Sequence, residues 1–170
     1  MKQPTKTKTT THVKPKKNKV FKKKKTFVKS RNASDLDGSG LETYFRVNIL
    51  DKLGVEYDQQ FEAHPIGRFY DFYLPKYRVL IECDGDFYHS NPEIYTTNLT
   101  ITQKRNKRVD ELKNKWASLN NYVLIRFWEK DIYGDSNGII EFINQRLKLQ
   151  NEVLLLRESK KNGSFFSKKI

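Results

Sequence analysis

The chain has 170 residues, enough for one domain with a single hydrophobic core, and it carries a formal net charge of +13 at pH 7. Its one cysteine, Cys83, excludes an intramolecular disulfide and a zinc site built on several thiolates, and it favours a reducing, intracellular location: the cytoplasm, the nucleoid or, for a viral protein, the host cell. No apolar run reaches the ~20 residues that a membrane span needs, and the N-terminal region lacks the apolar stretch of a secretion signal, so neither a membrane location nor secretion is expected.

The positive charge is concentrated in the first fifth of the chain. Residues 1–33 hold twelve lysines, one arginine and no acid, whereas the rest carries 20 basic and 20 acidic residues. With the small and polar residues that follow, this composition predicts a disordered basic arm and linker over residues 1–40. Nuclear import and solubility are alternative roles, but phosphate binding is favoured, because lysines bind DNA without reading its sequence. The densest basic run consists of Lys22, Lys23, Lys24 and Lys25.

The first predicted elements are one helix and three strands. Apolar residues recur every three or four positions from Leu41 to Leu53 and Gly54 follows, which predicts an amphipathic helix over residues 41–53. Aromatic and aliphatic runs then predict strands, with a tight connection at Pro75-Lys76 between the last two. These strands are expected at residues 57–63, 68–74 and 77–83.

The second half of the domain continues with a helix, a strand and a helix. Apolar residues at helical spacing predict a long amphipathic helix over residues 100–120, and a nearly continuous apolar run predicts a buried strand over residues 122–128. A last helix is expected to end near Leu156. The order α-β-β-β-α-β-α predicts an α/β domain with a mixed central sheet over residues 41–157, followed by a flexible basic tail over residues 158–170.

Two carboxylates lie in apolar strands, which is costly unless each has a partner. Asp71 interrupts one strand and Glu82 lies near the end of the next. A bound cation is one partner; a structural ion pair with Arg68, Arg78 or Arg126 is the alternative.

Chain reversal at Pro75-Lys76 would bring Asp71 opposite residues 80–82, so the two acids could lie on adjacent strands and share one ion. Carboxylate oxygens suit Mg²⁺ or Mn²⁺ better than zinc. With such an ion, phosphodiester hydrolysis becomes feasible, and His89 is the nearest residue suited to proton transfer.

Several motifs in this order resemble the Vsr-like branch of the PD-(D/E)XK nucleases, which includes very-short-patch mismatch repair endonucleases and the EDxHD homing endonucleases of phages. The resemblance covers residues 41–132 and is carried by Leu41-Glu42-Thr-Tyr-Phe, Asp71-Phe-Tyr-Leu-Pro-Lys-Tyr-Arg, Ile81-Glu82-Cys-Asp84-Gly-Asp-Phe-Tyr-His89, Asn106-Lys-Arg-Val-Asp110 and Val123-Leu-Ile-Arg-Phe-Trp-Glu129. It implies a restriction-endonuclease-like core and a metal-dependent endonuclease that nicks or cuts double-stranded DNA, in homing or repair, as a monomer or a homodimer.

The resemblance also implies roles for individual residues. Asp71 and Glu82 match the metal-binding acids, with the backbone carbonyl of Cys83 completing the coordination and Asp84 as a further ligand. His89 matches the catalytic histidine, and Asp110 and Glu42 match acids that orient histidines or water. On the helix that carries Asp110, Asn106 would face the same side as that acid. DNA contacts are expected from Lys104, Arg105 and Arg108.

Two departures from the family pattern limit these roles. Asp84 stands where the superfamily has a lysine, and the sequence leaves open whether His89 or Lys113 replaces it. The cysteines and histidines that hold zinc in the mismatch-repair enzymes are absent, which weakens the repair interpretation. A DNA-binding protein that has lost catalysis, and an interaction module whose arm contacts RNA or an acidic protein, are the alternative hypotheses.

Overall fold

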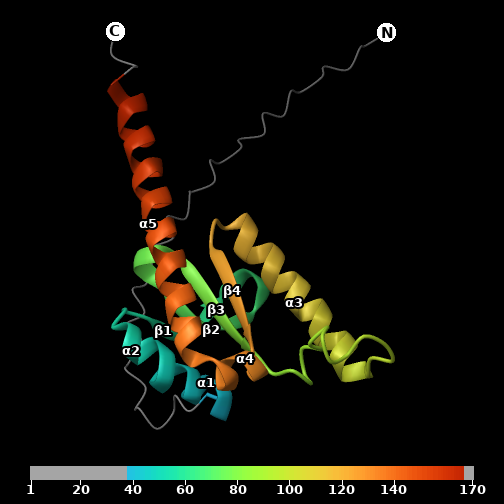
Figure 1. Cartoon of the computed structure of the whole chain (residues 1–170). Coiled ribbons are helices and arrows are strands. Elements are labelled where there is room, and N and C mark those ends of the chain that lie inside the picture. The colour runs from blue at the N-terminus through green and yellow to red at the C-terminus, as the bar shows by residue number, and fades with distance from the viewer. Residues whose placement is uncertain (1–37, 167–170) are drawn as a thin grey trace, which may run out of the picture. The chain divides into compact units, whose positions relative to one another are not determined.

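The computed structural model describes residues 38–166, with side chains up to Lys160, and Figure 1 shows their arrangement. The basic arm and the DNA contact predicted at Lys22–Lys25 lie outside the described residues. The described elements, in chain order, are α1 (Gly40–Phe45), η2 (Arg46–Leu50), α2 (Asp51–Leu53), β1 (Asp58–Ala63), η3 (His64–Ile66), β2 (Arg68–Leu74), η4 (Pro75–Tyr77), β3 (Val79–Asp84), α3 (Ile101–Leu119), β4 (Val123–Trp128), α4 (Glu129–Gly134) and α5 (Ser136–Phe166). This order confirms the predicted α/β succession, with the short α4 as an addition.

The first helical segment is continuous from Gly40 to Leu53 and ends where the sequence predicts. It begins one residue early, so Ser39 and Gly40, expected in the disordered linker, belong to the start of the helix. The side chain of Ser39 caps its N-terminus in a capping box with Glu42, and Gly54 ends it in the left-handed conformation at φ 63°. Its middle, η2, is a π-helical turn, which the sequence pattern did not indicate. Phe45 and Ile49 are fully buried there, so the apolar face packs into the core.

The four strands form one mixed sheet in the order β1-β2-β3-β4. The first three are antiparallel neighbours, and β4 returns through α3 to lie parallel to β3. The predicted strand start at Tyr77 is wrong, because Pro75–Tyr77 form a 3-10 turn and Arg78 takes a left-handed conformation at φ 53° before β3 begins at Val79. This short connection sets the register, in which Phe72 pairs with Ile81.

Helices cover both faces of the sheet. On one face, α3 packs over a smaller core that includes Tyr70, Leu80 and Ala117. On the other face, the first helical segment and α5 enclose a larger core that includes Phe45 and Ile143 (Figure 1). The domain is therefore built in three layers, with the sheet between them.

The last helix is longer than predicted. It continues to Phe166 rather than ending near Leu156, because no proline follows Ser136 and residues 153–156 are all apolar. The tail predicted over residues 158–170 therefore begins in a helix, and residues 167–170 lie outside the described part. None of the helices within residues 38–166 combines the length and the apolar character that crossing a membrane requires.

Candidate functional site

A hollow of about 480 Å³ opens at the C-terminal end of β3, between the first helical segment and α3. Its lining includes six residues from four elements and one loop: Glu42, Asp71, Glu82, Cys83, His89 and Lys113. We call this the acidic hollow, because three of these six are carboxylates and one is an amine.

Asp71 and Glu82 meet at this hollow from neighbouring strands, as predicted. The register that pairs Phe72 with Ile81 places Asp71 opposite Glu82 one position further along. The carboxylate of Asp71 also bridges the two strands directly, since its Oδ2 accepts a hydrogen bond from the Cys83 N–H at 2.7 Å. Both acids therefore line one opening instead of pointing to opposite sides of the sheet.

Burial and mutual repulsion disfavour the charged forms of both acids. Burial and then the charge of Glu42 raise the pKa of Asp71 to about 6. Burial and then the charge of Asp71 raise the pKa of Glu82 to about 8. The Glu82 side chain is 3% exposed, and its Oε1 has no hydrogen-bond partner among the described residues. A buried carboxylate oxygen without a partner is costly, so this atom marks an incomplete site.

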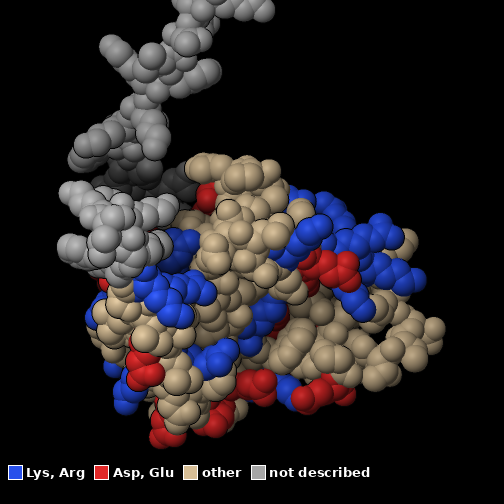
Figure 2. Space-filling model, turned by 90° about the horizontal axis from the view of Figure 1, so that it is seen from above, with Lys and Arg blue, Asp and Glu red and all other residues tan. Residues whose placement is uncertain are grey.

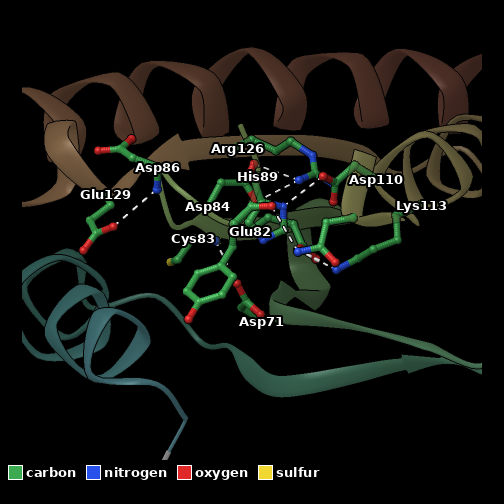
Figure 3. Close-up of polar contacts among 12 residues, drawn as sticks. Asp71, Glu82, Cys83, Asp84, Asp86, His89, Asp110, Lys113, Arg126 and Glu129 are labelled. Carbon is green, nitrogen blue, oxygen red and sulfur yellow. Dashed lines mark hydrogen bonds and ion pairs between the residues drawn. The ribbon is translucent and has the colours of Figure 1, made fainter. Parts of the chain in front are cut away.

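The protein partner of Glu82 is a lysine rather than one of the predicted arginines. Lys113, on the buried side of α3, donates from Nζ to Glu82 Oε2 at 2.5 Å (Figure 3). Arg78 instead donates to the backbone carbonyl of Asn120 at 2.8 Å, and Arg126 binds a different acid. The alternative interpretation of a structural ion pair is therefore realised for Glu82, but with Lys113 instead of one of the named arginines.

A second group of ionisable side chains lies beside the acidic hollow; we call Asp84, His89, Asp110 and Arg126 the histidine cluster. His89 Nδ1 lies 2.9 Å from Asp110 Oδ2 and 3.5 Å from Asp84 Oδ1. Arg126 donates from Nη1 to both oxygens of Asp84 at 2.8 Å, and its Nη2 lies 3.3 Å from Asp110 Oδ1 (Figure 3). One arginine thus links the two acids that flank the histidine.

These contacts set the protonation of the histidine cluster. Burial lowers the pKa of His89, but the hydrogen bond to Asp110 and the charge of Asp84 outweigh it, so the pKa ends above its ordinary value. Burial raises the pKa of Asp110, but the bond to His89 and the charge of Arg126 leave it below its ordinary value. Asp110 therefore stays ionised and orients His89 through Nδ1.

Asp84, predicted as a further metal ligand, lies in the histidine cluster rather than in the acidic hollow, and its role as a ligand stays a prediction. One ligand atom each from Asp84, His89 and Asp110 lies within 4.8 Å of the others, which by distance alone could hold an ion. The guanidinium of Arg126 already occupies both oxygens of Asp84, however, and Asp84 does not line the acidic hollow. At Asp84, the guanidinium of Arg126 supplies the positive charge that balances the carboxylate.

Glu42 and Asn106 line the acidic hollow, and both also have structural roles. Glu42 closes the capping box with Ser39, and its Oε2 accepts a hydrogen bond from Gln60 Nε2 at 2.7 Å. Asn106 donates to the Tyr88 carbonyl at 3.0 Å and so holds the loop before α3. Asp110, one helical turn later, binds His89. Both residues therefore shape the hollow as well as line it.

The basic side chains predicted to contact DNA lie on the solvent side of α3. Lys104, Arg105 and Arg108 are exposed, and Figure 2 shows lysine and arginine side chains gathered on this side of the molecule. Sequence reasoning treated Arg126 only as a structural partner and did not assign it to the histidine cluster. The signal was present, because Arg126 is a lone charge within the apolar run 123–128 and needed a buried partner as Asp71 did.

Comparisons with known proteins add no family assignment. Searches against protein-family models, curated proteins and solved structures find no match to this chain.

Proposed function

We propose that the protein is a metal-dependent DNA endonuclease built on a restriction-endonuclease-like core. The observation that supports this most is the meeting of Asp71 and Glu82 from adjacent strands at one hollow, with Glu82 Oε1 buried and unpartnered. Two such acids are what a nuclease needs to hold a divalent ion against a phosphate.

The residues of the acidic hollow fit Mg²⁺ or Mn²⁺. Their donors are carboxylate oxygens, which are hard ligands, and Glu42, Asp71 and Glu82 outnumber the one amine of Lys113. Asp71, Glu82 and the Cys83 carbonyl would hold the ion. When bound, the ion would polarise the phosphoryl oxygens and lower the pKa of a water molecule.

Lys113 is the residue that we propose in place of the missing superfamily lysine. Its ammonium group reaches the carboxylate of Glu82 from α3, while Asp84, at the superfamily position, binds Arg126. An amine beside the scissile phosphate would stabilise the negative charge that develops on the phosphate oxygens.

His89 is proposed to transfer a proton. Because Asp110 binds Nδ1, Nε2 is the nitrogen left to exchange a proton with the substrate or with water. His89 also lines the acidic hollow, so the histidine cluster reaches the proposed site through this one side chain.

DNA is proposed as the substrate because basic side chains lie outside the acidic hollow, where they could bind the phosphates of a duplex whose scissile phosphate lies in the hollow. Lys104, Arg105 and Arg108 on α3 can contact phosphates on either side of the cleaved bond, and the lysine-rich arm would add affinity without sequence preference.

Plasmid cleavage with a matched acid control tests the proposal. In about 5–10 mM Mg²⁺ or Mn²⁺, the full chain should nick or linearise supercoiled DNA. Asp71→Asn or Glu82→Gln should reduce the cleavage rate about 10³-fold or more. Asp58→Asn, an exposed acid on β1, should cut normally. Calorimetric titration with Mn²⁺ should show binding that both site variants weaken.

The competing function is DNA binding without catalysis. It is favoured by one observation, the occupation of Glu82 Oε2 by Lys113, which a metal would have to share or displace. Intact plasmid with either ion, together with no heat of Mn²⁺ binding, would establish this alternative and reject the nuclease.

A further inference from the structure

The strand β4 leaves one edge of the sheet open. β3 pairs with one side of β4, and within residues 38–166 no strand pairs with the other side. Val123 donates its N–H to the carbonyl of Arg78, toward β3. Figure 1 shows β4 at the edge of the sheet. Because backbone groups alternate along a strand and those of Val123 point toward β3, those of Leu124 and Arg126 point outward from the sheet. An edge of this kind is a template for another strand.

Two hollows lie along this open edge. One, of about 580 Å³, lies against Leu124 and is bordered by Asn114 and Ser118 on α3 and by Gln150 and Arg157 on α5. The other, of about 300 Å³, lies against Phe127 and is bordered by Phe142. The same face of α5 therefore follows the edge strand along its length.

An exposed apolar stripe continues along this side of α5. Its members are between 40% and 61% exposed and recur at intervals of seven, four and three residues, which is the spacing of one helix face. The stripe consists of Phe142, Leu149, Val153 and Leu156. The core-facing side of α5 holds Ile143 and Leu147. On the stripe, Phe142 packs edge to face against Phe127 of β4, with 5.9 Å between the ring centroids, whereas Leu149, Val153 and Leu156 are exposed.

The charges along the edge run from acidic to basic. Asp131 borders the hollow at the C-terminal end of β4. Arg78, Arg157 and Lys160 gather at the N-terminal end, with one acid among them. A second copy placed antiparallel across the edge would set the basic end of one copy against the acidic end of the other. Self-complementarity of this kind is what a twofold interface requires.

We propose that the β4 edge is a homodimer interface, in which two copies pair antiparallel to form one continuous sheet. The outward backbone groups of Leu124 and Arg126 would bond across the twofold axis, and the α5 stripes would cover each other on one face of the sheet. A second copy is favoured as the occupant because antiparallel pairing sets the acidic end at Asp131 of one copy against the basic end at Arg157 of the other, so the edge complements itself. This inference is independent of the proposed nuclease activity.

Sedimentation velocity of the full chain over a wide concentration range tests the proposal. A dimer should form with increasing concentration. Asp131→Lys and Arg157→Glu should each raise the dissociation constant about tenfold, and the two together should restore it close to the starting value. Lys148→Glu, on the face of α5 away from the stripe, is the matched control and should change it little.

A second set of variants and a hydrogen-exchange measurement test the α5 stripe and the β4 edge, with Asp131 and Arg157 left unchanged. Leu149→Lys with Val153→Lys should abolish the dimer while circular dichroism stays unchanged, because both side chains are exposed in the monomer. Hydrogen exchange should be slow at the outward amides of Leu124 and Arg126 only where the dimer forms. A chain that stays monomeric at every concentration, or a monomer in which these amides are already protected by another segment, overturns the proposal.

Discussion

The acidic hollow and the histidine cluster are neighbours with opposite charge balance. In the histidine cluster, Arg126 and a protonatable His89 compensate two acids, Asp84 and Asp110. The acidic hollow is lined by four acids, Glu42, Asp71, Glu82 and Glu129, and by the single amine of Lys113. The first group is held by the protein alone, whereas the second needs protons or a cation to become neutral. This contrast shows that a set of carboxylates indicates a ligand only where the protein has left their charge uncompensated.

Apart from the loss of Asp71 or Glu82, the largest expected effect is the loss of proton transfer by His89. His89→Ala should lower the cleavage rate about 10³-fold without loss of fold, since a positioned acid or base contributes 10²–10⁴. His64→Ala is the control, because that side chain is 80% exposed and pairs only with Glu62. Single-turnover rates on a nicked or linear duplex measure the change, and equal rates for both variants would remove His89 from the mechanism.

Removing Arg126 from the histidine cluster should destabilise the folded protein. Arg126→Met leaves Asp84 buried and without its main partner, which should lower the free energy of unfolding by about 3 kcal/mol. Arg105→Met, on the exposed face of α3, should change it by less than about 0.5 kcal/mol. Urea unfolding measures both. A small loss for Arg126→Met would mean that water compensates Asp84 as well as the guanidinium does.

Removing the one amine should make the acidic hollow more difficult to ionise. Lys113→Met should reduce cleavage about 10²-fold and move the pH at which Mn²⁺ binds upward, because Lys113 holds down the pKa of Glu82. Lys115→Met, exposed on the same helix, should leave both properties unchanged. Metal titrations at several pH values decide whether Lys113 acts on Glu82 or only on folding.

The uncompensated acids should make the metal-free protein less stable as the pH rises. The pKa values of Asp71 and Glu82 are raised to about 6 and about 8, so the folded state binds more protons than the unfolded state between about pH 4 and pH 8. Stability is then fullest at the low end of this window and declines through it as the two acids ionise.

Urea unfolding at about pH 5, 6.5 and 8, with a chelator present, measures how the free energy of unfolding changes with pH. Asp71→Asn should flatten this dependence and stabilise the protein at pH 8, whereas Asp58→Asn should not. Added Mg²⁺ should oppose the decline, because it binds the ionised acids. A metal-free protein whose stability rises from pH 5 to pH 8 would contradict the raised pKa values.

The smallest effect is expected from the exposed arginines and lysine of α3. Neutralising Lys104, Arg105 or Arg108 singly should weaken DNA binding a few fold and reduce the slope of log affinity against log salt by about 1 each. Lys148→Gln on α5 is the control. Fluorescence anisotropy at several salt concentrations measures the slopes, and an unchanged slope would place the phosphate contacts elsewhere.

Local patterns in the sequence predicted much of the fold. Capping by Ser39 and Gly54, the short connection at Pro75–Tyr77 and the apolar run of β4 are each encoded within a few residues, so the element order and the meeting of Asp71 with Glu82 could be predicted. The π-helical turn η2 could not, because the burial of Ile49 and Leu50 in the core stabilises it more than local propensity does. The end of α5 was placed too early, although the sequence contains no proline after Ser136 that would stop the helix near Leu156.

The composition and spacing of the chain by themselves determined that two acids on adjacent strands would need a partner. Only the tertiary structure decided which partner each acid has. Glu82 binds Lys113, 31 residues away, and Asp84 binds Arg126, 42 residues away. Both contacts depend on how α3 crosses over to bring β4 parallel to β3, and the angle and depth of that crossing follow from packing over the whole domain.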